Sequence, residues 1–97
     1  MNIDDMKQAA AEAATLMQAL SNQNRLLLLC ALVDGEQSVG ALADLLNLRQ
    51  TSVSQQLALL RKDGFVKTRR EGQTIFYSLD GDEASQIIEI LNKLYCH

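Results

Sequence analysis

The sequence is poor in aromatic residues: it has no tryptophan, two tyrosines and two phenylalanines. Its core must therefore be built mainly from Leu, Ile, Val and Ala, which favours helices. The longest apolar run, residues 26–33, is too short to span a bilayer, and the N-terminal segment lacks the basic start and apolar stretch of a secretory signal. We therefore expect a soluble, cytoplasmic protein that does not bind a membrane.

Histidine occurs once, as His97, and its scarcity argues against most enzyme classes. Apart from the adjacent Cys96 and His97, the chain has no Ser-His-Asp or Cys-His arrangement and no glycine-rich phosphate loop. We therefore predict that the protein is not an enzyme and needs no cofactor. The other cysteine is Cys30, and in a reducing compartment a permanent structural disulfide between the two is not expected.

The formal net charge of −3 hides an uneven distribution along the 97 residues. Residues 49–73 contain six Lys or Arg against two Asp or Glu, whereas the rest of the chain has three basic and ten acidic residues. This asymmetry favours one basic face for a polyanion on an otherwise repelling body. The chain is long enough for one core, so we predict a single domain, residues 1–97.

Apolar residues recur at helical spacing near the start of the chain. The first stripe comprises Met6, Ala10, Ala13, Met17 and Leu20. A second helix is predicted between an N-cap at Ser21 or Asn22 and the Asp34-Gly35 pair. Its centre is apolar on all sides, so we expect this helix to be buried.

The next two predicted helices form a helix-turn-helix, because only about two to four residues join them. Ser38 caps the third, residues 39–47, and the fourth runs from residue 49 to the Asp63-Gly64 pair. The residues expected to face the core are Val39, Leu42, Leu45 and Leu46 in the third helix and Val53, Leu57 and Leu60 in the fourth.

The periodicity changes to two in "FVKTRREGQTIFYSL", which predicts a β-hairpin around residues 71–73. A last helix follows in residues 80–97, with an apolar stripe of Ala84, Ile87, Ile88, Leu91, Leu94 and Tyr95. The predicted fold is mainly α with a small β-hairpin (α+β), a winged helix-turn-helix. The first and last helices are more than one small winged domain needs, so their stripes are left to pair with a second copy.

The start of the fourth helix presents hydroxyls and amides opposite its core-facing residues, and cations follow. In a recognition helix such polar side chains reach base edges in the major groove, while nearby cations bind phosphates. We therefore predict that the protein binds double-stranded DNA. The predicted DNA-binding residues are Arg49, Gln50, Thr51, Ser52, Ser54, Gln55, Gln56, Arg61, Lys62, Lys67, Arg69, Arg70 and Gln73.

Two other interpretations of this surface stay open. In the first, the polar stretch is a solvated helix end whose Ser and Thr residues only cap the helix. In the second, the winged helix binds a protein in place of DNA. That second interpretation predicts hydrophobic or mixed-charge residues at Thr51, Gln55 and Lys62 and no basic hairpin, so we favour DNA.

Three segments resemble the ArsR (arsenic-repressor-type) winged-helix regulators: "LSNQNRLLLLCAL", "SVGALADLLNLRQTSVSQQLALLRKDGFV" and "RREGQTIFYSL". "LLLLCALVDGEQSVGALADLL" and the ending "LYCH" are more similar to the HlyU-like branch, which includes biofilm regulators and sulfide-responsive members. The resemblance implies a homodimer built from the first and last helices and an imperfectly palindromic operator. At Gln56 the family often has His, and we expect altered helix support or base preference there.

The metal-sensing patterns of this family are missing from the chain. Arsenic-type sensors carry a Cys-x-Cys-type pair in the third helix, where this sequence has no sulfur. Zinc-type sensors use His with Asp or Glu in the last helix, and here His97 is accompanied only by Asp82, Glu83 and Glu89. A tight transition-metal site generally needs several N or S donors, so we predict no metal site.

In the HlyU-like branch two thiols sense oxidants or reactive sulfur by forming a disulfide or polysulfide bridge. The resemblance implies this redox role for Cys30 and Cys96, with a reactive sulfur species or an oxidant as the inducer. Two alternatives stay open: both cysteines are merely small hydrophobic residues, or the regulator has no inducer site and acts by displacing a silencer from DNA.

Overall fold

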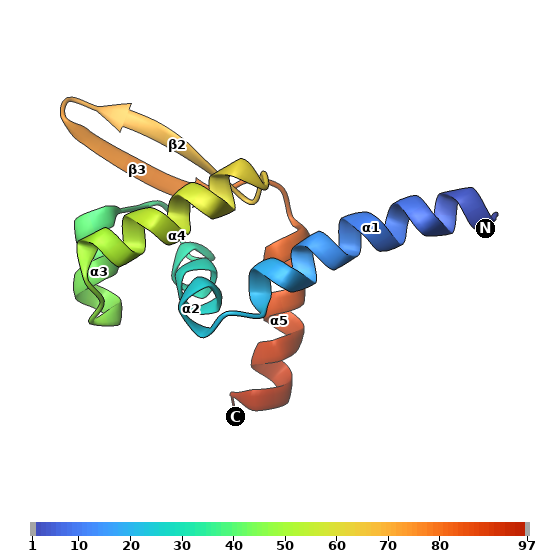
Figure 1. Cartoon of the computed structure of the whole chain (residues 1–97). Helices are drawn as coiled ribbons and strands as arrows, with labels where there is room; N and C mark the ends of the chain where they lie inside the picture. Colours follow the sequence, from blue (N-terminus) through green and yellow to red (C-terminus); the bar gives the residue numbers. More distant parts are fainter. Residues whose placement is uncertain (1, 97) are drawn as a thin grey trace.

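The architecture is a helical body with a small wing (Figure 1), and the computed structural model describes residues 2–96. The elements are α1 (Ile3–Leu20), α2 (Gln23–Leu32), β1 (Gln37–Ser38), α3 (Val39–Leu46), α4 (Gln50–Lys62), β2 (Val66–Glu71), β3 (Thr74–Leu79) and α5 (Glu83–Tyr95). The predicted winged helix-turn-helix is confirmed. Within residues 2–96, no helix combines the length and apolarity needed to cross a membrane.

The wing contains one strand more than predicted. β2 and β3 form the expected antiparallel hairpin, closed by Gly72 and Gln73 with Gly72 at φ 62°, a backbone conformation that glycine adopts without strain. The two-residue strand β1 adds to the other side of β3 and gives the order β1-β3-β2. It escaped prediction because two residues cannot show an alternating pattern.

The core lies where α3 and α4 pack on α2 and on the base of the wing. The predicted inward face of α4 is confirmed, since Val53, Leu57 and Leu60 are fully buried. Their main fully buried partners are Leu28, Leu29, Leu42 and Val66, with the nearly buried Leu32 and Ile88 at the edge. This packing fixes the direction in which the opposite face of α4 points.

Two predictions of burial were wrong. Leu45 of α3 is 63% exposed, because the inward arc of this short helix is centred on Leu42 and Ala43. The second helix is not buried on all sides either: Leu27 and Val33 are partly exposed, because the body covers only one side of α2.

The two terminal helices carry much of the exposed apolar surface of the described residues. α1 runs away from the body (Figure 1), and only Leu16 and Ala19 near its end are buried. The exposed large apolar residues of these helices are Ile3, Met6 and Met17 in α1 and Ile90, Leu94 and Tyr95 in α5. Of the predicted stripe of α1, only Leu20 is half-buried within one chain, and the buried Leu16 and Ala19 lie outside that stripe.

Candidate nucleic-acid interface

The hydroxyl-bearing residues at the start of α4 follow the N-cap and belong to the helix itself. Arg49 is the N-cap, with φ −72° and ψ 140°, and its side chain makes no capping hydrogen bond. Thr51, Ser54 and Gln55 are exposed within the first turns, while Ser52 is half-buried. The interpretation of these hydroxyls as helix caps is therefore wrong. The first N–H groups of α4 have no side-chain acceptor at the cap position, which favours an anion there.

The turn between α3 and α4 holds this helix end in place. Asn47 adopts the left-handed conformation at φ 55°, and its N–H donates to the carbonyls of Ala43 and Asp44. Leu48 then donates to Ala43 at 2.9 Å and packs against the core. A three-residue connection, residues 47–49, thus starts α4 in a fixed direction, as a helix-turn-helix requires.

Gln56 differs from its neighbour Gln55. Gln55 is exposed, whereas Gln56 is half-buried beside the core-facing row of α4. The Gln56 Oε1 atom accepts a hydrogen bond of 3.3 Å from Nη1 of Arg25 in α2. Sequence reasoning did not foresee this partner, because Arg25 lies 31 positions earlier in the chain.

The remaining predicted residues of the candidate site lie at the two ends of α4 and on the wing. Arg61 and Lys62 are exposed in the last turn of α4, where they also complement the helix dipole. Lys67, Arg69 and Arg70 are exposed on β2. Gln50 at the start of α4 and Gln73 at the tip of the wing are exposed as well. These predicted residues thus occupy both the helix-turn-helix and the wing.

Arg69 is engaged within the protein. Its Nε atom donates to Glu36 at 3.1 Å and its Nη1 atom donates to Glu71 at 2.9 Å, and the guanidinium lies 4.8 Å from the Phe76 ring centroid. The hydrogen bonds from Arg69 lower the pKa of Glu36, and the two carboxylates raise the pKa of Arg69. By contrast, no ion pair of Arg70 is found within residues 2–96.

Both cysteines are free thiols and both are exposed. The alternative in which both cysteines are merely small hydrophobic residues does not fit Cys30, because this residue lies on the uncovered side of α2. Its pKa is raised, first by partial burial and second by the charge of the Cys96 thiolate. Cys96 is the C-cap of α5, where its N–H donates to the Asn92 carbonyl at 2.9 Å.

The residues considered above as metal ligands near the last helix are Asp82, Glu83, Glu89 and His97. No three His, Cys, Asp or Glu side chains of residues 2–96 are grouped so that they could hold a metal ion. His97, the one histidine, lies outside the described residues.

Comparison with known proteins gives the same outline. Residues 22–68 match the family described as "Bacterial regulatory protein, arsR family". The transcriptional activator HlyU of Vibrio cholerae is 48% identical over 96 residues, which cover 99% of this chain and 89% of that protein. The biofilm growth-associated repressor of Agrobacterium fabrum is 46% identical over 91 residues, which cover 94% and 78%.

Solved structures agree over nearly the whole chain. The structure of reduced HlyU from Vibrio cholerae has a TM-score of 0.91 at 46% identity and covers 98% of this chain and 100% of that one. A homodimeric winged helix-turn-helix DNA-binding domain from Mycobacterium bovis has a TM-score of 0.82 at 28% identity, covering 96% and 86%. The chain therefore belongs to the ArsR family of bacterial regulatory proteins, and it is a transcriptional regulator of the HlyU type rather than an enzyme.

Proposed function

We propose that this regulator reads a specific DNA sequence through the exposed face of α4 and holds the flanking backbone with its wing. The observation that carries the proposal is the start of α4. There the side chains of Thr51, Ser54 and Gln55 belong to the helix and are exposed to solvent, with no carboxylate among them. Amides pair bidentately with adenine, and hydroxyls serve several bases. The exposed cations of β2 and of the end of α4 are suited to phosphates.

The DNA-binding unit in this proposal is a cytoplasmic homodimer on an imperfect palindrome. Support comes from the exposed apolar residues of α1 and α5, such as Met6 and Leu94, and from the homodimeric relative. In such a dimer the two copies of α4 lie about 34 Å apart, one turn of duplex. The similar proteins include an activator and a repressor, so the position of the operator in a promoter decides the sign of regulation.

Substitution of Gln55 tests the reading role of α4. The Gln55→Ala variant should lose about 1–3 kcal/mol of discrimination at one base position, because a bidentate amide contact is removed. Binding is measured on a panel of operator variants. The control is Gln86→Ala, which truncates an exposed glutamine on α5. If Gln55→Ala instead weakened every sequence equally, α4 would not be the reading element.

The second part of the proposal assigns a redox switch to Cys30 and Cys96. The two thiols are free and exposed, α2 packs against α5, and the charge of Cys96 reaches Cys30. With hydrogen peroxide as oxidant, the two thiols give up two electrons and two protons to form one S–S bond, and the hydrogen peroxide becomes two waters. The bridge joins α2, which packs behind α4, to the end of α5.

Control of DNA binding comes from a difference in bridge strain between the bound and free conformations. A coupling of about 1–3 kcal/mol weakens operator binding roughly 5–150-fold. We expect peroxide or polysulfide to weaken operator binding of the wild type. Cys30→Ser and Cys96→Ser should each abolish this response, while the variants without oxidant bind the operator as tightly as the reduced wild type. Mass spectrometry should detect the linked pair. An unchanged affinity after treatment would favour a regulator without an inducer, which acts by displacing a silencer.

A further inference from the structure

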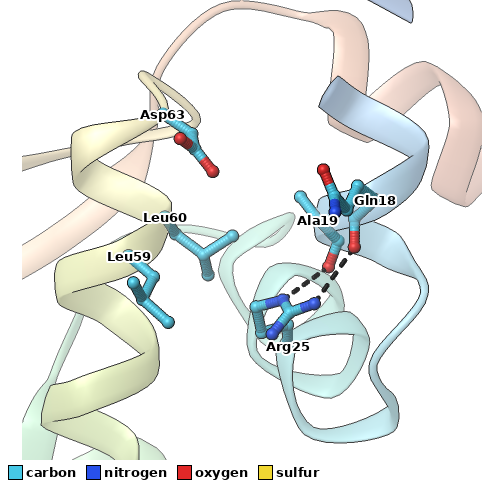
Figure 2. Close-up of a pocket in the computed structure, with 6 residues that line it drawn as sticks. All are labelled: Gln18, Ala19, Arg25, Leu59, Leu60 and Asp63. Atoms are coloured by element: carbon cyan, nitrogen blue, oxygen red, sulfur yellow. Dashed lines mark hydrogen bonds between the residues drawn. The ribbon is translucent and has the colours of Figure 1, made fainter. Parts of the chain in front are cut away.

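The guanidinium of Arg25 lies where three helices meet. Its Nε and Nη2 atoms donate to the carbonyls of Ala19 and Gln18 at the end of α1, both at 3.0 Å (Figure 2). Its Nη1 atom donates to Gln56 Oε1 on α4 at 3.3 Å. One side chain of α2 therefore contacts both the terminal helix α1 and the recognition helix α4.

The sequence explains why an arginine stands here. The last carbonyls of a helix carry the negative end of its dipole, and the last turn of α1 contains no basic residue. Arg25 supplies that charge from the next helix. Its backbone is fixed at the start of α2, where its own N–H donates to Oδ1 of the N-cap Asn22 at 3.1 Å. The planar guanidinium presents several donors in a fixed geometry, which an ammonium group does not.

Apolar packing between α1 and α4 is incomplete at this point. A pocket of about 180 Å³ opens between the end of α1 and the C-terminal half of α4 (Figure 2). It is lined by Gln18, Ala19, Arg25, Leu59, Leu60 and Asp63. Arg25 lines this space, and its hydrogen bonds connect the end of α1 to α4 beside it.

We propose that Arg25, acting through Gln56, is a positioning residue that sets the angle of α4 relative to α1 and thereby the half-site spacing that the dimer prefers. The inference rests on the proposed function, in which α1 joins the two copies and α4 reads each half-site. Gln56 is among the residues predicted from the sequence to bind DNA, but in this proposal it is an acceptor for Arg25 and makes no contact to a base. Its partly buried position beside Leu57, next to the exposed Gln55, fits that division.

The test compares operators that differ only in spacing. Binding is measured on the palindrome at its natural spacing, on the same palindrome with one base pair inserted, and on a single half-site. The variants are Arg25→Lys, which keeps the charge without the planar donors, and Gln56→Met, which removes the acceptor at similar volume. Gln56→Glu restores an acceptor, and thermal unfolding of every variant monitors the fold.

The wild type should bind the natural spacing more tightly than the inserted one. In Arg25→Lys and Gln56→Met this preference should shrink by about threefold to tenfold, which corresponds to coupling energies of about 0.65–1.4 kcal/mol. The affinity of both variants for a single half-site should stay unchanged, and Gln56→Glu should keep the wild-type spacing preference. The double variant should lose no more of this preference than the single variant that loses more. If the role of Arg25 were purely structural, the variants would bind all three DNAs more weakly to the same extent.

Two negative outcomes are distinguishable. If the wild type itself had no spacing preference, the proposed palindrome-binding dimer would be wrong. If the wild type had the preference and both single variants kept it in full, the role of Arg25 would be overturned. Should Arg25→Lys destabilise the fold, Gln56→Met decides alone, because it leaves the bonds of Arg25 to α1 in place.

Discussion

The two adjacent arginines of the wing should contribute unequally to the salt dependence of DNA binding. Arg69 is held by Glu36 and Glu71 and lies against Phe76, whereas Arg70 is exposed and forms no ion pair within residues 2–96. Arg69 must give up a carboxylate before it binds a phosphate. Arg70 has no such competitor, so it should be the stronger phosphate contact.

The magnitude follows from counterion release. Each phosphate neutralised on duplex DNA adds about 0.9 to the slope of log affinity against log salt. When one contact is lost, the total decrease in affinity between 50 and 200 mM salt becomes about 3.5-fold smaller. We expect Arg70→Ala to reduce the slope by about 0.9 and Arg69→Ala by less than half of that.

Glu36→Gln supplies the matched experiment, since it removes the competing charge and leaves the size of the side chain. This variant should bind all duplexes more tightly and with a steeper slope. In its background Arg69→Ala should become more harmful than in the wild type, although Glu71 still competes for Arg69. Fluorescence anisotropy with a random duplex at five salt concentrations gives the slopes. Equal slopes for Arg69→Ala and Arg70→Ala in the wild-type background would refute the argument.

Two further predictions concern stability and thiol reactivity. Leu57→Ala should lower the free energy of unfolding by about 2–5 kcal/mol, because Leu57 is fully buried. Leu59 on the same helix is 51% exposed, so Leu59→Ala should change the free energy of unfolding by about 0.5 kcal/mol or less. Equal losses for the two variants in urea denaturation would contradict this. Because burial and Cys96 raise the pKa of Cys30, its alkylation by iodoacetamide should accelerate at higher pH than that of an ordinary thiol. Cys96→Ser should speed the reaction of Cys30 near neutral pH only in part, since the larger cause, burial, remains.

Helical periodicity predicted the elements that position the site. The burial of Val53, Leu57 and Leu60 was predictable because their spacing repeats the helical turn. Their burial determines which residues of α4 face outward. Local sequence also identified the cap Ser38, whose side chain accepts from the N–H of Ala41, and it limited the N-cap of α2 to Ser21 or Asn22, of which the structure has Asn22. These features depend on neighbours a few residues away, so one sequence contains the information.

Contacts between distant segments were not predictable in the same way. Glu36 meets Arg69 because β1 pairs with β3 and β3 pairs with β2, and a two-residue strand leaves no signal. The bond between Arg25 and Gln56 depends on the relative placement of α2 and α4. The exposure of Cys30 depends on which side of α2 the body covers.

The same distinction changes the meaning of the charge distribution. Counting charges assigns residues 49–73 a strongly basic character, and that count treats Arg69 and Arg70 as equivalent. The fold brings Glu36 from outside this range onto Arg69, so one cation of the wing is compensated before DNA arrives. A charge count therefore locates the candidate DNA-binding surface, while the ion pairs within it decide which cations are available to phosphate. For this wing, we expect Arg70 to be more available to phosphate than Arg69 as long as the pair of Arg69 with Glu36 is intact.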